Sequence, residues 1–164
     1  MLAYAFLAAL AVLSPGVVHG SMGEFGEAPV GCYGDQNSDI AAVTIPALKG
    51  LLVDKEPSVI DKYFASDYIQ HNPDFPSGNE ALFELLKLPF EYEVGQVTYM
   101  GDTVWLHSRL TGIGPVPLIA LDIFRVADGL IVEHWDVLQP EVPANETVRG
   151  NSMLTVVPNP LNMM

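Results

Sequence analysis

The sequence contains little cysteine and few positively charged residues. The 164 residues include one cysteine, Cys32, so no disulfide bond can form within the chain. Seven Lys and Arg stand against twenty Asp and Glu, which gives a formal net charge of -13. A chain this acidic repels phosphate backbones and anionic membrane surfaces. We therefore expect no nucleic-acid partner, and no membrane partner once the N-terminal segment described below has been removed.

The sequence also lacks the common motifs of cofactor and nucleophile chemistry. It contains no Gly-rich phosphate loop, no G-x-S-x-G turn and no C-x-x-C pair. Its four histidines do not have the i, i+4 or tight loop spacing of a zinc site, and no Ser-His-Asp pattern is visible. We therefore predict no metal site.

The first 20 residues resemble a secretory signal peptide. Residues 1–13 are apolar and uncharged, and Ser14-Pro15-Gly16 breaks this run. The run is short for a membrane span, and Val18-His19-Gly20 offers small residues for cleavage after Gly20. We predict a secreted protein, with a retained hydrophobic N-terminal helix as the alternative. Asn145-Glu146-Thr147 is an N-glycosylation sequon, which matters only in a eukaryotic secretory route.

The rest of the chain divides into three parts. Residues 21–37 are rich in glycine and acidic residues without apolar periodicity, and we interpret them as an extension. Residues 38–140 carry the periodic apolar patterns of one folded domain, whose length allows a sizeable core. Residues 141–164 are rich in Pro and Asn, which predicts a tail with little structure of its own.

Within residues 38–140 the helical patterns come first and the strand patterns follow. Helices are expected at three places: 38–52, where Pro46 kinks the helix or lies near its start, 57–64 and 80–88. A short extended segment at 68–73 precedes the third helix, and strands are expected at 91–100, 103–111, 119–126 and 130–138. This order predicts an α+β fold and not a doubly wound parallel sheet.

The last two strands form a hairpin within Pro117–Pro140 that carries polar residues inside apolar strands. Because successive residues point to opposite faces, one face of the first strand is predicted to hold Ala120, Asp122, Phe124 and Val126. The matching face of the second strand is predicted to hold Val132, His134, Asp136 and Leu138. The opposite face holds Arg125, Glu133 and Trp135.

The cluster of Asp122, His134 and Asp136 predicts a pocket. A carboxylate among apolar residues is costly to bury, so it acquires a partner or lines a wet cavity. The alternative is that both carboxylates make surface or edge contacts and His134 is a histidine with its hydrogen bonds satisfied in the core. Alternation alone leaves both interpretations open.

Three segments of the chain carry a resemblance to a known family. They are DKEPSVIDKYFASDYIQHNP (54–73), GDTVWLHSRLTG (101–112) and LDIFRVADGLIVEHWDVLQP (121–140). Together they resemble the SnoaL-like polyketide cyclases of the NTF2-like superfamily. The resemblance implies an α+β cone, in which three N-terminal helices pack on a strongly curved, mainly antiparallel sheet. It also implies a small organic ligand in the cone, no cofactor, and a homodimer through the outer face of the sheet.

A second comparison concerns the ketosteroid isomerases of the same superfamily. Residues 122–126, DIFRV, match their D-x-x-R-[FV] strand motif, in which a protonated aspartic acid serves in an oxyanion hole. Their general-base aspartate corresponds to Asn72 here, and their oxyanion tyrosine falls near Lys49. The resemblance therefore implies an acid role for Asp122 and argues against steroid isomerisation by that mechanism.

Two hypotheses of function result. The first is a secreted, cofactor-independent enzyme that performs aldol condensation, isomerisation or dehydration on a small carbonyl compound by acid/base catalysis. Its predicted catalytic residues are Asp122, His134, His71 and Asp136. Its predicted ligand contacts are Asn72, His107 and Phe124. The alternative is a non-catalytic carrier of a hydrophobic small molecule, or a dimeric scaffold.

Overall fold

The structure is a computed structural model that describes residues 32–33 and 39–162. The predicted signal segment, 1–20, lies outside the described residues. Of the extension at 21–37, only β1 (Cys32–Tyr33) is described, as a two-residue strand that pairs with the sheet. The site and the fold below are therefore properties of the region from Asp39 onward.

The first helix, α1 (Asp39–Leu48), runs through its proline. Asp39 lies in the first turn, where a carboxylate interacts favourably with the exposed backbone N–H groups. Pro46 removes one helical hydrogen-bond donor, and the helix then widens into a π-helical turn, η1 (Lys49–Val53). This turn buries Leu51 and Leu52, two apolar side chains that later prove to line a pocket.

The other two helices are short. α2 (Ser58–Tyr63) follows Pro57, as the sequence predicted, and ends at Phe64, whose backbone is already extended. α3 (Glu80–Leu85) has six residues, so α1 is the single α-helix longer than six among the described residues. In residues 39–162 no helix has the length and hydropathy that a membrane crossing requires.

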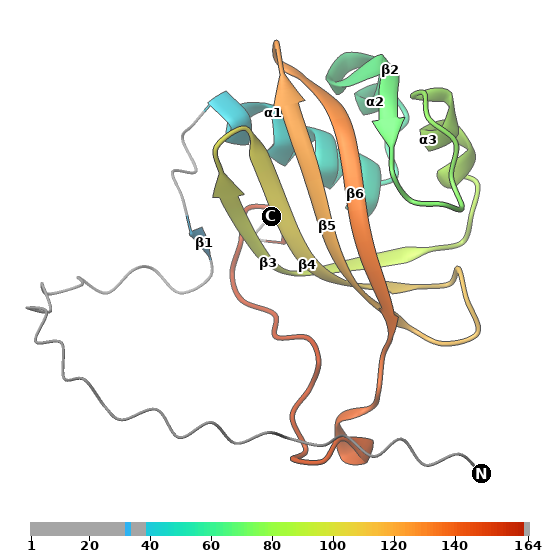
Figure 1. Cartoon of the computed structure of the whole chain (residues 1–164), viewed down its shortest axis with the longest axis vertical. Coiled ribbons are helices and arrows are strands. Elements are labelled where there is room, and N and C mark those ends of the chain that lie inside the picture. The colour runs from blue at the N-terminus through green and yellow to red at the C-terminus, as the bar shows by residue number, and fades with distance from the viewer. Residues whose placement is uncertain (1–31, 34–38, 163–164) are drawn as a thin grey trace, which may run out of the picture.

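The strands form one mixed sheet with the order β1-β3-β4-β5-β6-β2 (Figure 1). Its central strands are β3 (Glu91–Met100), β4 (Thr103–Thr111), β5 (Leu118–Ala127) and β6 (Leu130–Pro140). These four are antiparallel neighbours, whereas β1 and β2 (Phe64–Gln70) add to the two edges in parallel. The predicted α+β order is confirmed, with a sheet that is more mixed than the expectation of a mainly antiparallel one.

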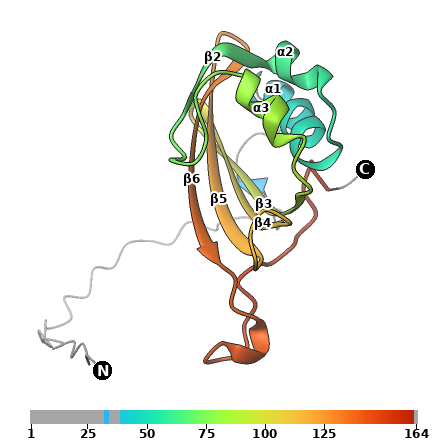
Figure 2. The same ribbon diagram turned by 90° about the vertical axis from the view of Figure 1, so that its right-hand side faces the viewer.

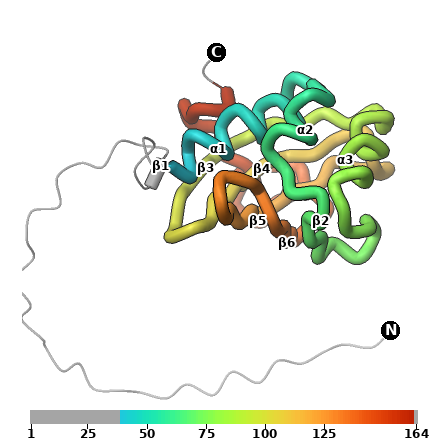
Figure 3. The backbone as a smooth tube through the Cα atoms, turned by 90° about the horizontal axis from the view of Figure 1, so that it is seen from above, coloured from blue at the N-terminus to red at the C-terminus, as the bar shows by residue number. Residues whose placement is uncertain are grey.

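The helices cover one face of the curved sheet (Figure 2). Seen from above, α1 lies toward the β3 side of this layer and α3 lies toward the β2 side (Figure 3). The core between the layers contains apolar side chains from both, and its most buried members include Leu48, Leu51, Ile60, Tyr68, Leu106 and Ile131. The inner face of the sheet is thus the face on which a pocket can form.

A bulge in the last hairpin corrects one detail of the predicted alternation. Ile131 pairs with Val126, while Glu133 pairs with Arg125, so Val132 has no partner of its own across the strand. The extra residue brings Ile131, which is fully buried, onto the same inner face as His134. Val132 is half-buried and is not part of the buried core, so the strict alternation predicted for this strand is interrupted at that residue.

A glycine fixes the junction between β4 and the loop that leads to β5. Gly112 has φ = 84°, a left-handed conformation that favours glycine. A Cβ atom at this position would lie 2.1 Å from the carbonyl oxygen of Pro89. The close approach ties this loop to the segment that enters β3, at the end of the sheet where the pocket opens.

The segment after Pro140 returns to the sheet although it contains only one short 3-10 helix, η2 (Ala144–Glu146). It descends from β6 and climbs back to β3 (Figure 1). The N–H of Val157 donates to the carbonyl of Gly95 at 3.1 Å, and the side-chain amide of Asn159 donates to that of Val94 at 3.2 Å. Leu161 is 3% exposed and belongs to the core. Residues 141–162 therefore have little regular structure but pack against the domain.

Candidate functional site

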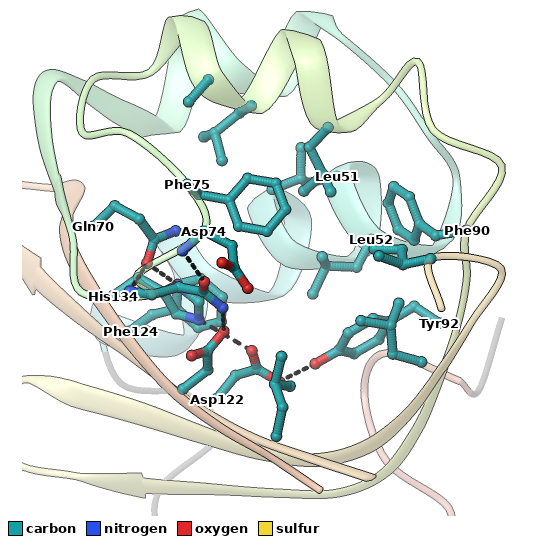
Figure 4. A pocket seen from close by; sticks show the side chains of 18 of the residues that line it. Leu51, Leu52, Gln70, Asp74, Phe75, Phe90, Tyr92, Asp122, Phe124 and His134 are labelled. Carbon is teal, nitrogen blue, oxygen red and sulfur yellow. Dashed lines mark hydrogen bonds and ion pairs between the residues drawn. The ribbon is translucent and has the colours of Figure 1, made fainter. Parts of the chain in front are cut away.

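A pocket of about 230 Å³ opens between the inner face of the sheet, α3 and η1 (Figure 4). Its wall is mostly apolar, with contributions from Leu51, Leu52, Phe75, Leu82, Phe90, Leu110 and Leu138 among others. Its polar side chains come from β2, β3, β5 and β6 and from the loop after β2. An apolar cavity with a few convergent polar groups is the usual form of a small-molecule site.

Asp122 and Asp136 are direct cross-strand partners at the polar end of this pocket. Side chains at such positions have Cβ atoms about 5 Å apart, and like charges there are destabilising. Asp122 is only 6% exposed, so water screens the pair poorly. A protein keeps such a pair when other groups bind to it, and each carboxyl group here has its own partners.

Asp122 receives hydrogen bonds on both of its oxygens. The hydroxyl of Tyr92 donates to Oδ2, and Nε2 of His134 lies 3.0 Å from Oδ1. Burial, followed by the neighbouring charge of Asp122, raises the pKa of Tyr92 well above its usual value, so this tyrosine stays a hydrogen-bond donor. Tyr92 on β3 thus supplies a hydroxyl group to Asp122.

The hydrogen bonds of Gln70 determine which nitrogen of His134 carries a proton. The backbone N–H of Asn72 donates to Oε1 of Gln70 at 2.9 Å, which identifies this atom as the amide oxygen. The same oxygen lies 2.9 Å from Nδ1 of His134, so Nδ1 must be the donor. Nε2 then faces Oδ1 of Asp122, and their contact requires one further proton, shared between the imidazole and the carboxyl group.

Asp136 is held by Asn72. The backbone N–H of Asp74 donates to Oδ1 of Asn72 at 2.8 Å, so the amide nitrogen of Asn72 faces Asp136. It donates to Oδ2 of Asp136 at 2.5 Å, and Asn72 itself is only 5% exposed. The carboxylate of Asp74 points into the pocket (Figure 4). Asp136 therefore differs from Asp122, because its partner is an amide donor and no imidazole proton is shared with it.

Two aromatic residues complete this end of the pocket. The ring of Phe124 stacks on the imidazole of His134, with centroids 4.4 Å apart and planes 17° from parallel. Tyr68 is almost fully buried, and this burial, with the charges of Asp122 and Asp136, raises its pKa. The ring of Phe124 restricts the orientation of His134, and the predicted position of Phe124 at the pocket agrees with the structure.

His71 does not reach the pocket, which corrects its predicted place among the site residues. Gln70 and Asn72 point inward, so His71 between them points to the outer face of the sheet. There it stacks on Trp135, with ring centroids 4.8 Å apart, and its Nε2 lies 2.8 Å from Oε1 of Glu133. Hydrogen bonds from His71 and then Arg125 lower the pKa of Glu133.

His107 also lies away from the pocket. Its strand neighbours Leu106 and Ser108 are fully buried on the inner face, so His107 points outward on β4. It is not among the residues that line the pocket. The predicted ligand contact through His107 is therefore not formed, whereas Asn72 and Phe124 do line the pocket.

Folding brings together a set of possible metal ligands that the linear spacing did not show. One ligand atom from each of Asp122, His134 and Asp136 lies within 4.8 Å of the others. One imidazole and two carboxylates can bind a divalent transition-metal ion. In the arrangement seen here, such an ion would have to replace the proton between Asp122 and His134.

Four polar residues of the pocket were not predicted: Tyr68, Gln70, Asp74 and Tyr92. Strand alternation from Tyr68 through Asn72 puts Gln70 and His71 on opposite faces, but alternation alone does not say which face is the inner one. Tyr92 has the same phase as Val94 on a predicted strand, but its distance from Asp122 depends on how three strands pair. Asp74 lies in a loop, where no periodicity indicates direction.

Comparison with known proteins supports the fold and the family. A family model described as a SnoaL-like domain matches residues 50–134, just over half of the chain. No match was found among curated proteins.

Solved structures with this fold have low sequence identity to the chain. An NTF2-like protein of unknown function from Mesorhizobium loti has a TM-score of 0.54 at 18% identity, covering 67% of this chain and 99% of that one. A protein described as a polyketide cyclase from Bacillus cereus has a TM-score of 0.52 at 20% identity, covering 62% and 74%. An LEH-like epoxide hydrolase of M. tuberculosis has a TM-score of 0.51 at 21% identity, covering 64% and 86%.

Proposed function

The chain belongs to the SnoaL-like domain family, and we propose on this premise that it binds a small, mainly apolar carbonyl compound and transfers protons within it. The observation that carries the proposal is the 3.0 Å contact between Nε2 of His134 and Oδ1 of Asp122 at the end of an apolar pocket, a contact that requires a proton between the two groups. A carboxylate with a different environment, Asp136, lies directly across the strand. Two acidic groups with different environments are the usual basis for separate acid and base roles.

The roles follow from the hydrogen bonds. Asn72 donates to Oδ2 of Asp136, which leaves Oδ1 to accept a proton from the carbon next to the substrate carbonyl. The carbon–hydrogen bond breaks, and its electron pair moves toward the carbonyl oxygen as an enolate forms. The Asp122–His134 pair donates its shared proton, or a hydrogen bond, to that oxygen. Return of the proton, or attack of the enolate on a second carbonyl, gives isomerisation or aldol condensation.

Gln70 and Tyr92 act as positioning residues in this scheme. Gln70 keeps the proton of His134 on Nδ1 and so keeps Nε2 directed at Asp122. Tyr92 binds the second oxygen of Asp122 and so limits rotation of the carboxyl group. Neither residue has to touch the reacting atoms for its loss to reduce the rate.

A non-catalytic carrier is the second candidate. The observation that favours it is the mostly apolar wall of the pocket, which is sufficient to bind a hydrophobic molecule without reaction. The two candidates differ in one measurable property. Only the enzyme exchanges hydrogen at the carbon next to a bound carbonyl group.

Exchange of carbon-bound hydrogen in D2O tests the proposal without knowledge of the natural substrate. The probe is 2-tetralone, a compact apolar ketone, and the loss of its C1 proton signal is followed by NMR with and without protein. The folded chain is expected to accelerate exchange above the buffer rate. Asp136→Asn should reduce the protein-dependent rate about 10²- to 10⁴-fold, the usual contribution of a positioned base.

Asp128→Asn is the matched control, because it removes the same charge from the exposed β5–β6 turn. Asp128 has φ = 51°, a conformation that Asn tolerates well. The control should exchange at the wild-type rate. Binding of 2-tetralone without any exchange would reject the enzyme and leave the carrier, and neither binding nor exchange would reject both.

Two further parts of the proposal concern the oligomeric state and the localisation of the protein. The outer face of the sheet exposes apolar side chains such as Val137 and Ile69, which suits a homodimer through that face. Light scattering of the purified chain should then give twice the monomer mass, and Val137→Glu should reduce this to the mass of one monomer.

Secretion with cleavage after Gly20 predicts a mature chain that begins at Ser21, which N-terminal sequencing of exported protein would check.

A further inference from the structure

The pocket has no cation to bind an acidic ligand. All seven Lys and Arg residues lie in the described part of the chain, and none of them lines the pocket. Four of them pair with carboxylates elsewhere: Lys49, Lys87, Arg109 and Arg125. Lys62 and Arg149 are exposed.

The seventh cation, Lys55, contacts the pocket wall from behind. Its Nζ donates to the carbonyl of Leu52 at 2.7 Å and lies 2.8 Å from the ring centroid of Phe90. Burial lowers its pKa to about 8, so Lys55 keeps most of its charge at pH 7 and uses it in these two contacts. Leu52 and Phe90 line the pocket and Lys55 does not, so these groups separate it from a bound molecule.

Carboxyl groups, in contrast, converge on the polar end of the pocket. Asp74, Asp122 and Asp136 all line it, with one imidazole among them. The proton shared by Asp122 and His134 makes that pair neutral as a unit. Two negative charges remain, on Asp74 and Asp136, and the hydroxyl groups of Tyr68 and Tyr92 do not offset them.

We infer that the pocket takes an apolar molecule with a basic amine at the end that meets Asp74 and Asp136, and that it rejects carboxylic acids and phosphates. An ammonium group has donors for both carboxylates and reduces their mutual repulsion. An acidic ligand would bring a third negative charge beside these two, one of which, on Asp136, is half-buried and only partly screened by water. The inference rests on the proposed use of this pocket for binding, but it does not depend on proton transfer.

Three ligands with one ring system and different head groups test this inference. They are 1-naphthylmethylamine, 1-naphthylmethanol and 1-naphthoic acid, titrated by calorimetry at pH 7. Salt at 0.15 M screens charges more than about 8 Å away, so the remaining differences report on the pocket. The amine is expected to bind at least tenfold more tightly than the alcohol, and the acid at least tenfold more weakly.

Asp74→Asn and Asp128→Asn then separate the pocket from the net charge of the chain. Both variants remove one negative charge, but Asp74 lines the pocket and Asp128 lies in the β5–β6 turn. The ratio of amine to alcohol affinity should fall at least threefold in Asp74→Asn and stay unchanged in Asp128→Asn, with equal alcohol affinity in both.

The inference is overturned if the acid binds as well as the alcohol, or if the two variants change the ratio equally. These outcomes leave proton transfer in the pocket intact, since the ketone exchange assay measures that separately. If none of the three ligands binds, the inference fails, and the ketone exchange assay still decides the proposed function. An amine preference without ketone exchange refutes the catalysis alone.

Discussion

Replacing Asp122 by Asn and by Leu separates its role in hydrogen bonding from its role in holding a proton. Asn has the same shape, so its Oδ1 can accept from Tyr92 while its Nδ2 donates to Nε2 of His134. This match exists only because Gln70 fixes the proton of His134 on Nδ1. Asp122→Asn should therefore fold normally and retain ligand, but it should lose ketone exchange.

In the Leu variant the hydroxyl of Tyr92 has no acceptor, and Nε2 of His134 has no partner. A buried polar group that loses its partner costs about 1 to 3 kcal/mol, and two such groups appear here. We expect Asp122→Leu to lower the free energy of unfolding by about 2 to 4 kcal/mol, and Asp122→Asn to lower it by less than about 1 kcal/mol. For a domain of this size the Leu variant corresponds to a drop of roughly 10 °C in Tm.

Urea denaturation followed by tryptophan fluorescence measures both free energies under the same conditions. Equal destabilisation by Asn and Leu would refute the hydrogen-bond assignment, because Asn could then not be satisfying both neighbours. Full ketone exchange in a stable Asp122→Asn variant would refute the proton role and leave the hydrogen bonds as purely structural.

Three further predictions concern the framework around the site. Gly112→Ala should lower the free energy of unfolding, measured by urea denaturation, by more than about 2 kcal/mol, because the added Cβ would collide with the backbone of Pro89. Gly101→Ala should lower it by only about 1 kcal/mol, because no atom lies within 4 Å of a Cβ at that position. Leu161→Ala should cost about 2 to 4 kcal/mol if the C-terminal segment supports the core; thermal melting equal to wild type would contradict this. Glu133 has a lower pKa in the folded chain than the ordinary 4.5, so its contribution is complete above about pH 4.5 and is lost as the pH falls through its folded pKa. Glu133→Gln should therefore reduce the dependence of the free energy of unfolding on pH below about pH 4.5. An unchanged pH dependence would exclude the interaction of Glu133 with His71.

The sequence predicted the polar end of the pocket where one strand pair was enough to define it. Asp122, His134 and Asp136 were placed on one face by alternation, and the turn between their strands fixed the pairing. The same argument failed at Val132, because a bulge inserts a residue without any signal in the local pattern. Strand alternation therefore predicts the direction of a side chain only as far as the nearest β-bulge.

The partners of these residues depend on contacts between distant elements. Tyr92 reaches Asp122 across β4, and Gln70 reaches His134 through a parallel pairing of β2 with β6. Register between distant strands is set by the packing of the whole sheet and is not encoded in either segment alone. His71 was misplaced for a related reason, since the phase of the strand before Pro73 was unknown from the sequence.

Intermolecular nuclear Overhauser effects between bound 2-tetralone and the protein test the central claim most directly. If the ketone binds in the pocket beside the acid/base set, its protons will show contacts to the methyl groups of Leu82 and Leu110 and to the ring of His134. Contacts to the exposed methyl groups of Val137 on the outer face, with none to Leu82, Leu110 or His134, would contradict the account.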